Sequence, residues 1–222
     1  MKIAIITWFH YHNYGTALQA FALSKYLEEQ GHVVDFINYI PDGKVVALPS
    51  ESDWKYYFGK AKKIIKNFNC DTYQLKEREK LFDDFLKENF KMTNLCSTFS
   101  DFYNLNENYD AFICGSDQIW APSCYDPHYF LDFVQDTRKM IAYAPSVGLN
   151  SIDNVDIRDN VKRLTERFIW ISTREKSGSS LIEELIKRHV ETVIDPTLLF
   201  DKLEWYSLFD LTSKKQNKGY LL

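Results

Sequence analysis

The sequence predicts an α/β fold, a Rossmann-like parallel sheet flanked by helices. Short, nearly unbroken apolar runs, such as residues 2–8, are typical of strands that are covered on both faces. Stretches with apolar residues at three- and four-residue spacing separate these runs, as in β-α-β units. Most of the runs end in small polar residues, which is where open α/β sheets place their ligands.

The elements of the first half follow in order. A strand at 2–8 leads into a polar loop at 10–15, and a helix follows in which apolar residues recur at helical spacing until Gly31 ends it in the left-handed manner. The next strand is expected at 33–39, so the first forty residues form a right-handed β-α-β unit.

A loop at 41–53 and two charged amphipathic helices at 54–68 and 72–90 are expected next. A strand at 109–114 follows. The long segment at 116–137 is too polar and too aromatic to be helical throughout.

In the second half, strands at 139–144, 168–172 and 191–194 alternate with helices at 152–165 and 177–189. Each of these strands is followed by a polar signature, and the repetition predicts one shared crevice at the strand ends. The signatures are Ser146-Val147-Gly148, Thr173-Arg174-Glu175 and Asp195-Pro196-Thr197.

Residues 1–211 are expected to form one Rossmann-like N-terminal domain. A short helix that contains Trp205 is followed by a polar linker at 212–218, and the final apolar residues resemble the start of another strand. We therefore expect 212–222 to be a linker and the first strand of a truncated C-terminal domain.

Composition excludes several function classes. The chain has 222 residues with 27 Lys and Arg against 31 Asp and Glu, a formal net charge of -4. Without a basic stripe, nucleic acid is not an expected partner, whereas a small anionic or sugar substrate is compatible. The 14 Tyr and 16 Phe can fill a core or stack on sugar rings.

The cysteines and the apolar runs bear on location. Four cysteines without Cys-x-x-Cys spacing, and no secretory signal, favour a reduced, cytoplasmic protein. No apolar run reaches the roughly 20 residues of a membrane span, so at most peripheral membrane contact is expected, at the inner face of the membrane. Aromatics at 54–58 followed by lysines suit a lipid interface or an amphipathic helix that covers the sheet. The lysines are Lys60, Lys62, Lys63 and Lys66.

The junction after residues 111–114 is the first candidate site. The apolar run there ends directly in Gly115, Ser116, Asp117 and Gln118, with Trp120 close behind. Such a junction delivers backbone amides and polar side chains to one edge of a sheet. The alternative is an ordinary Gly-Ser-Asp turn, with Trp120 packed on the core.

The loop before the first helix is the second candidate. Asn13, Gly15 and Thr16 lie where exposed amides and the helix dipole attract phosphate or carboxylate, but the same residues suit simple helix capping. The spacing of His10 and His12 allows metal ligation. Since no third ligand and no Asp-x-Asp pair are suggested, neither a metal nor a cofactor is expected, and a histidine here can contact substrate or donate a proton.

Arg174 and Glu175 form the third candidate. An arginine at the end of a strand can hold phosphate or carboxylate through two hydrogen bonds while a neighbouring acid orients it. We expect Asp117 and Asp195 to reach the same edge. The alternative is a local ion pair that closes the edge of the sheet.

Six segments, in the order of the family, resemble the polysaccharide pyruvyl transferases. They are Asn13-Tyr14-Gly15-Thr16-Ala17-Leu18-Gln19, Gly115-Ser116-Asp117-Gln118-Ile119-Trp120, Tyr129-Phe130-Leu131-Asp132-Phe133, Ile141-Ala142-Tyr143-Ala144-Pro145-Ser146-Val147-Gly148, Ile171-Ser172-Thr173-Arg174-Glu175 and Asp195-Pro196-Thr197-Leu198-Leu199. The resemblance implies a two-domain fold similar to GT-B glycosyltransferases, of which this chain is the N-terminal half.

It also implies an activity. Similar proteins transfer the pyruvyl group of phosphoenolpyruvate to a sugar, forming a ketal on a bacterial surface polysaccharide or its lipid-linked precursor. Arg174 looks like the arginine that grips phosphoenolpyruvate. The family's Arg-Leu-His segment, a further ligand and acid catalyst, has no match here, so we expect this chain to be inactive alone. A homo-oligomer is compatible with the resemblance.

From motifs and resemblance together we expect catalytic roles for Asp117 and Arg174. Substrate contacts are expected from His12, Asn13, Gly15, Thr16, Gln19, Gly115, Ser116, Gln118, Trp120, Ser146, Glu175 and Asp195. Two alternatives remain open. One is a GT-B-like glycosyltransferase that uses a nucleotide-sugar donor, and the other is a non-catalytic module that binds a glycan or an anion.

Overall fold

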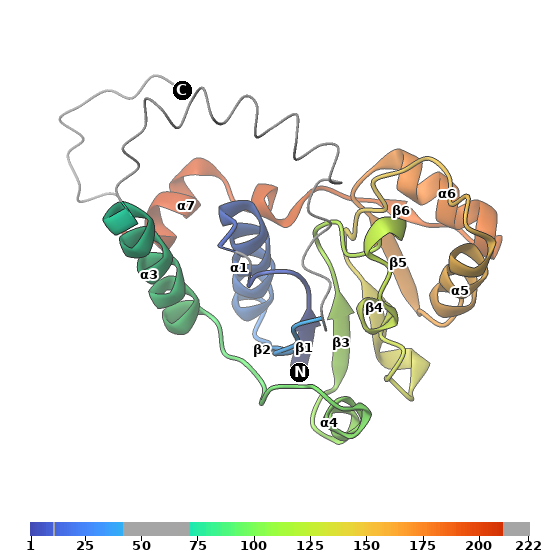
Figure 1. Cartoon of the computed structure of the whole chain (residues 1–222), viewed down its shortest axis with the longest axis horizontal. Coiled ribbons are helices and arrows are strands. Elements are labelled where there is room, and N and C mark those ends of the chain that lie inside the picture. Colours follow the sequence, from blue (N-terminus) through green and yellow to red (C-terminus); the bar gives the residue numbers. More distant parts are fainter. Residues whose placement is uncertain (11, 42–71, 211–222) are drawn as a thin grey trace.

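A six-stranded, all-parallel sheet is the centre of the molecule (Figure 1). The computed structural model describes residues 1–10, 12–41 and 72–210, with the backbone alone for 72–76. The strands lie in the order β2-β1-β3-β4-β5-β6, which confirms the predicted α/β class with a parallel sheet. In chain order they are β1 (Lys2–Ile6), β2 (Val33–Phe36), β3 (Ala111–Cys114), β4 (Met140–Ala142), β5 (Trp170–Thr173) and β6 (Glu191–Thr192).

Helices cover the two faces of this sheet. Side chains of β1 and β3 alternate between two apolar clusters: Ile3 and Ile5 pack with α1, α3 and α7, whereas Ala4 and Ile6 pack with α5, α6 and the chain between β2 and β4. The helices are α1 (Tyr14–Glu29), α3 (Thr72–Asn89), α4 (Phe99–Tyr103), α5 (Val155–Thr165), α6 (Lys176–Ile186) and α7 (Lys202–Leu208). Short 3-10 turns span Asn104–Glu107, Pro122–Cys124, Pro127–Phe130, Thr137–Lys139 and Pro196–Leu198.

The register brings the ends of the central strands level. Ile6 pairs with Cys114, Cys114 with Ala142, and Ala142 with Ile171. The loops that leave β1, β3, β4 and β5 therefore start side by side at the carboxyl edge of the sheet. This arrangement is what allows distant polar segments to meet there.

Most predicted elements are present with shorter bounds. The strand expected at 139–144 ends at Ala142, because Ala144 is in the left-handed region with φ +55°. The helix expected from 152 begins at Val155, after Asn154 accepts a hydrogen bond from the Ile157 amide as its cap. Gly31 has φ +83°, which confirms the left-handed end of α1.

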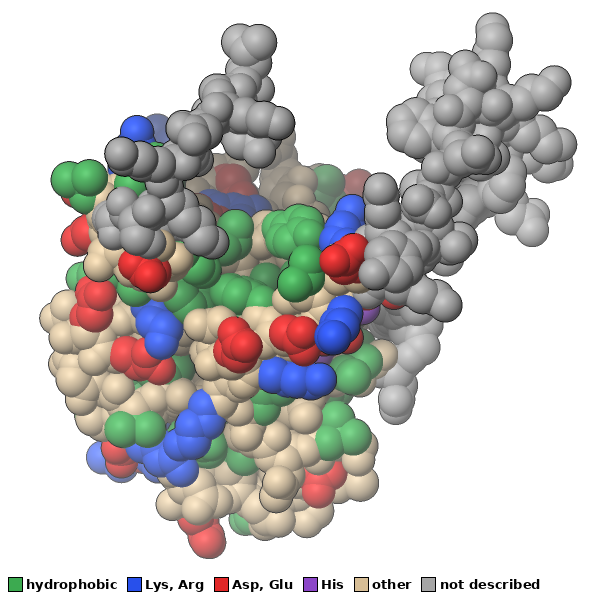
Figure 2. Space-filling model, turned by 90° about the vertical axis from the view of Figure 1, so that its left-hand side faces the viewer, with side chains coloured by type: hydrophobic (Ala, Val, Ile, Leu, Met, Phe, Trp, Pro, Cys, Tyr) green, Lys and Arg blue, Asp and Glu red, His purple; other side chains and the backbone are tan. Residues whose placement is uncertain are grey.

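Some expectations fall outside the described residues. These are most of the loop at 41–53, the helix at 54–68 with its lysines, Cys70, and the linker and strand at 212–222. The short helix α4 was not predicted from the sequence. Among the described residues, no helix is both long and apolar enough to cross a membrane. On the face shown in Figure 2, acidic and basic side chains are interspersed, in keeping with the small net charge.

Candidate functional site

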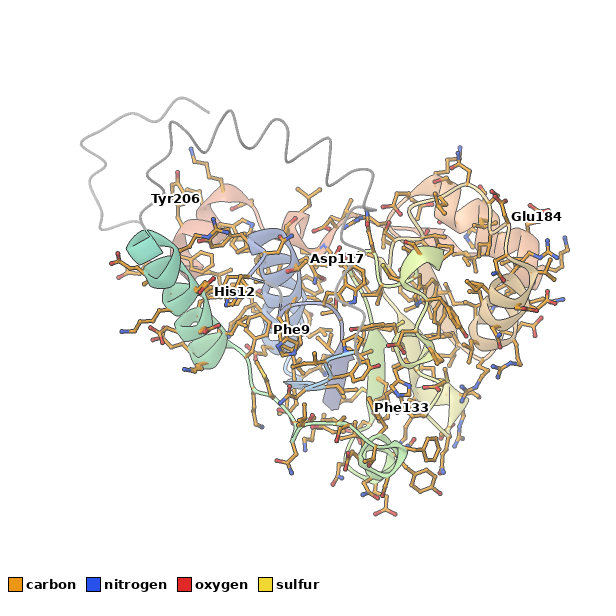
Figure 3. All side chains as sticks on the ribbon, viewed as in Figure 1. Phe9, His12, Asp117, Phe133, Glu184 and Tyr206 are labelled. Carbon is orange, nitrogen blue, oxygen red and sulfur yellow. The ribbon has the colours of Figure 1, made fainter. Side chains whose placement is uncertain are left out.

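A pocket of about 340 Å³ lies at the carboxyl edge of the sheet. Its walls come from the loops after β1, β3, β5 and β6, so four segments that are far apart in the sequence meet there. The lining residues are Asn13, Gly15, Thr16, Gln19, Asp117, Arg174, Asp195 and Thr197. The predicted shared crevice is therefore present, and we call it the polar pocket. In Figure 3, Asp117 lies beside α1 at this end of the sheet.

Arg174 is held by two acids in this pocket. Its Nε donates to Glu175 Oε1 at 3.0 Å and its Nη1 donates to Asp195 Oδ2 at 2.9 Å. Partial burial alone lowers the pKa of the guanidinium, but the bonds to Glu175 and Asp195 outweigh it and raise the pKa. The local ion pair, which was the alternative to a ligand-binding role for Arg174, is therefore present. Arg174 also lines the polar pocket.

Thr197 is a lining residue that belongs to the Asp195-Pro196-Thr197 signature but was not among the expected substrate contacts. Asp195 Oδ1 accepts hydrogen bonds from the Thr197 amide at 2.9 Å and from its hydroxyl at 2.7 Å. The Thr197 carbonyl in turn accepts from Trp205 Nε1 at 3.1 Å, which ties α7 to this loop. The Asp-Pro-Thr triplet after a strand is a capping pattern that could have indicated the arrangement.

Asp117 is the third carboxyl group close to Arg174, after Glu175 and Asp195. Its Oδ1 accepts from the Gln118 amide at 2.7 Å, and its backbone has φ +67°. Burial has the largest effect and raises the pKa of the Asp117 carboxyl. The hydrogen bond from the Gln118 amide and the charge of Arg174 lower this pKa by less, and the charge of Asp195 raises it further. A carboxylate with a raised pKa is a better proton acceptor than an ordinary aspartate, so it can take a proton from a bound hydroxyl.

Gly115 and Ser116 support the pocket from behind. The Ser116 side chain is fully buried, its amide donates to Gln19 Oε1 at 3.0 Å, and its hydroxyl donates to the Ala144 carbonyl at 3.1 Å. Gln19 therefore joins the loop after β3 to α1, and it also lines the cavity. Gly115 has φ +119°, and a Cβ there would lie 2.0 Å from the Tyr143 carbonyl oxygen.

Replacing Gly115 by alanine is expected to lower the free energy of unfolding by about 3 kcal/mol or more, because strain at positive φ adds to overlap with fixed backbone. Gly31→Ala is the matched control, since its φ is +83° and nothing lies within 4 Å of the added Cβ. It should cost only about 1 kcal/mol. Urea unfolding measures the free energy of unfolding of both variants. Equal losses of stability would show that the close approach of the added Cβ to the Tyr143 carbonyl does not matter.

The side chain of Asn13, the residue before α1, caps the first turn of this helix. Asn13 Oδ1 accepts from the Gly15 amide at 2.9 Å and from the Thr16 amide at 3.4 Å. Of the two interpretations of this loop, the structure shows helix capping. The Gly15 and Thr16 amides already donate hydrogen bonds to the Asn13 side chain. Asn13 and Thr16 both line the polar pocket, and the Thr16 hydroxyl donates to the Asn13 carbonyl at 2.8 Å.

The structure places Trp120 in the core. Its side chain is 1% exposed, its ring stacks on Phe130 with centroids 4.9 Å apart, and Nε1 donates to the Tyr129 carbonyl at 3.0 Å. This corrects the expectation that Trp120 contacts a sugar, because its only donor is satisfied and its ring has almost no exposed surface. The alternative, packing on the core, is correct.

His12 also lies apart from the polar pocket. Its Nε2 is 3.0 Å from Asp83 Oδ1 on α3, and its ring meets Phe82 edge-on at 5.1 Å. In Figure 3 it lies between α1 and α3, on the side away from β5 and β6. The expected substrate contact of His12 is therefore not at this pocket.

The other expected contacts border the polar pocket without lining it. Ser146 donates its amide to the Asp117 carbonyl at 2.7 Å, and its buried hydroxyl has no hydrogen-bond partner among the described residues. Glu175 holds Arg174, and Gln118 is exposed at the rim. Substrate contacts by these side chains stay predictions.

His10 is packed against its neighbour Phe9. Its ring lies on Phe9 with centroids 3.9 Å apart, and Nε2 is buried without a hydrogen-bond partner among the described residues. Burial lowers the pKa of His10 from 6.5 to about 4. Within the described ranges, no three His, Cys, Asp or Glu side chains are grouped as a metal site would need.

The low pKa of His10 makes stability depend on pH. Between pH 6.5 and about 4 the unfolded chain binds this proton while the folded chain does not, so stability is full above 6.5 and falls as the pH drops. The loss is on the order of 3 kcal/mol across that window. In His10→Phe, urea unfolding between pH 7 and 4 should show a shallower decline, and an unchanged decline would contradict this assignment.

A family model described as polysaccharide pyruvyl transferase matches residues 13–220, which is nearly the full length. No curated protein matches the chain. The matched range includes every residue that lines the polar pocket.

Proposed function

The chain belongs to the polysaccharide pyruvyl transferase family, and from this premise we propose that it acts in the transfer of the pyruvyl group of phosphoenolpyruvate to two hydroxyls of a saccharide acceptor. The supporting observation is that Arg174 and the carboxyl of Asp117, whose pKa is raised, share one pocket at the carboxyl edge of the sheet. An anion-binding group and a proton acceptor are two of the groups that this reaction requires.

The chemistry sets the requirements. The methylene carbon of phosphoenolpyruvate gains a proton, positive charge develops on the adjacent carbon, phosphate leaves, and two sugar hydroxyls attack in turn. One phosphoenolpyruvate and one diol thus give a ketal and one phosphate, and each hydroxyl loses its proton. The protein must therefore hold several negative charges, accept protons from hydroxyls and supply one proton to carbon.

We assign these roles to named groups. Arg174, oriented by Glu175 and Asp195, holds an anionic group of phosphoenolpyruvate through its guanidinium. Asp117 orients an acceptor hydroxyl and accepts its proton. On the same wall, the side-chain amide nitrogen of Asn13 suits a remaining sugar hydroxyl, while its oxygen caps α1.

The general acid is not assigned to this pocket. Among the described residues, the titratable side chains that line it are two carboxylates and one guanidinium. We propose that the acid comes from a second domain of a GT-B-like fold, with residues 1–211 as the N-terminal domain and 212–222 as the connection. The proposed setting is the cytoplasmic face of the membrane, where a lipid-linked saccharide is accessible.

Phosphate release tests the proposal. The natural full-length protein, incubated with phosphoenolpyruvate and saccharide acceptors, should release phosphate only when both are present. Consumption of uridine or guanosine diphosphate sugars without phosphoenolpyruvate would instead indicate a glycosyltransferase. Glycan binding that is indifferent to phosphoenolpyruvate, with no phosphate released, would indicate a binding module.

A further inference from the structure

The side chain of Gln19 lines the polar pocket, yet its polar atoms are bonded to the protein itself. Nε2 donates to Thr7 Oγ1 at 3.2 Å, to the Trp8 carbonyl at 3.2 Å and to the Thr16 carbonyl at 2.8 Å. Oε1 accepts from the Ser116 amide at 3.0 Å. Since a side-chain amide has only two N–H groups, three acceptors leave none of them for a ligand.

These bonds join three segments that meet at the pocket. Thr7 and Trp8 follow β1, Thr16 lies in the first turn of α1, and Ser116 follows β3. Thr7 Oγ1, which accepts from Gln19, also donates to the Ser116 carbonyl at 3.1 Å. Both the amide and the carbonyl of Ser116 are therefore held by the pair of Gln19 and Thr7, whose residues are each 2% exposed.

The backbone that is held in this way leads directly into Asp117. The Ser116 carbonyl belongs to the peptide group between the two residues, and Asp117 itself has φ +67°. A residue other than glycine adopts this conformation at an energetic cost and keeps it where its surroundings fix the backbone. On the other side, the Asp117 carbonyl accepts from the Ser146 amide at 2.7 Å.

We propose that Gln19 is a positioning residue for Asp117, which fixes the direction of the carboxyl at the wall of the polar pocket and does not itself bind the saccharide. A contact with a sugar would require Gln19 to release a buried carbonyl, which would then lack a partner. The catalytic consequence rests on the proposed function, because that function makes Asp117 the proton acceptor. The placement of the carboxyl can be measured without it.

Gln19→Met tests the placement in the full chain without substrate, by NMR titration of the Asp117 carboxyl carbon. Methionine has a similar length but cannot accept from the Ser116 amide, so Asp117 is no longer held against the buried wall. Because burial is what raises the pKa of Asp117, the carboxyl of the variant should titrate at a lower pH, closer to 3.8. In the phosphate-release assay, kcat should fall roughly tenfold or more while KM changes little.

Asn106→Leu is the matched control. The Asn106 side chain also joins separate segments, since Nδ2 donates to the Tyr103 carbonyl at 2.9 Å and the Phe133 carbonyl at 3.1 Å, and Oδ1 accepts from the Gln135 amide at 2.9 Å. It precedes β3 and does not line the polar pocket. Its loss should lower the free energy of unfolding, but the pKa of Asp117 and kcat should match the wild type.

Two further variants separate the bond to Ser116 from folding. In Gln19→Glu a carboxylate oxygen can still accept from the Ser116 amide, so kcat should recover in part and the pKa of Asp117 should not fall below that of the wild type. If Gln19→Met does not fold, Thr7→Val carries the test. It keeps the shape but loses the bond to the Ser116 carbonyl, and it should shift the pKa of Asp117 and kcat in the same direction by less.

The outcomes are distinct. An unchanged pKa of Asp117 in folded Gln19→Met, or an equal shift in Asn106→Leu, would overturn the proposal. A raised KM for the saccharide with an unchanged pKa of Asp117 would also overturn it and make Gln19 a substrate contact. Phosphate release by the wild type together with either result refutes this inference alone. A lowered pKa in Gln19→Met, in a protein whose wild type releases no phosphate, supports the positioning of Asp117 and refutes the pyruvyl transfer.

Discussion

Replacing Arg174 by alanine lowers kcat/KM for phosphate release from phosphoenolpyruvate on the order of a hundred- to a thousandfold, if the proposed function is correct. The guanidinium is held at two nitrogens by Glu175 and Asp195, so its orientation is fixed before any ligand binds. A preorganised cation in a partly buried pocket stabilises an anion more than a mobile surface charge does. The effect should be measured at low substrate concentration, where both binding and chemistry contribute.

Two further variants separate charge from geometry and from folding. Arg174→Lys keeps the charge but loses the planar fork, so it should recover only part of the activity. Arg138→Ala is the matched control, because Arg138 is also paired with an aspartate, Asp136, but is 83% exposed and far from the polar pocket. It should turn over like the wild type. Near wild-type turnover in a folded Arg174→Ala protein would remove Arg174 from the site.

Asp117→Asn is expected to reduce kcat by roughly a hundred- to ten-thousandfold, the range for loss of a positioned proton acceptor. The amide keeps the shape of the side chain and can still accept the hydrogen bond from the Gln118 amide, but it cannot take a proton from a hydroxyl. The loss should therefore appear in kcat, with KM changed little.

The pH dependence of Asp117 gives a second readout. The group must be ionised to act, and its pKa is raised by burial above the ordinary value of 3.8. The wild-type rate should therefore fall as the pH drops through that raised pKa, and the residual rate of Asp117→Asn should lack this limb. Asp153→Asn, at an exposed position that accepts a bond from Ser151, should behave as the wild type. If the rate of Asp117→Asn still falls at low pH as the wild-type rate does, another group is responsible for that fall.

The strands and their meeting point could be predicted from the sequence. Continuous apolar runs identify strands that are buried on both faces, and parallel strands bring their carboxyl ends to one edge. Gly15, Asp117 and Arg174 therefore meet as expected, although more than 150 residues separate the first from the last. Strand ends were predicted too long because apolar residues such as Trp8 and Tyr143 continue past the last residue of the strand.

The orientation of single side chains could not be predicted in the same way. Trp120 points into the core because Phe130 offers a stacking partner, a contact that the local motif does not contain. His12 is drawn to Asp83, which is 71 positions away in the sequence. Asn13 satisfies both a capping pattern and a ligand pattern, and only the positions of its neighbours show that it caps the helix.

A pocket of about 240 Å³, lined by apolar side chains of α1 and α3 and by Phe209, cannot be recognised in the sequence for a related reason. Leu18 and Phe85 each fit an amphipathic pattern that predicts burial against the sheet. Their common cavity arises from how three segments pack, and no single segment indicates it. Side chains with large exposed fractions, such as Leu81, distinguish an open apolar surface from a closed core.

The transfer of a labelled pyruvyl group tests the central claim most directly. Phosphoenolpyruvate with ¹³C in its methylene carbon would be incubated with the natural full-length protein and a saccharide and glycolipid extract of the cells that encode it. We predict that the label appears as a methyl resonance on a saccharide, with one phosphate released for each methyl group and with both signals lost in Arg174→Ala. Label that stays in phosphoenolpyruvate, while a nucleotide sugar is consumed in the same mixture, would contradict the account.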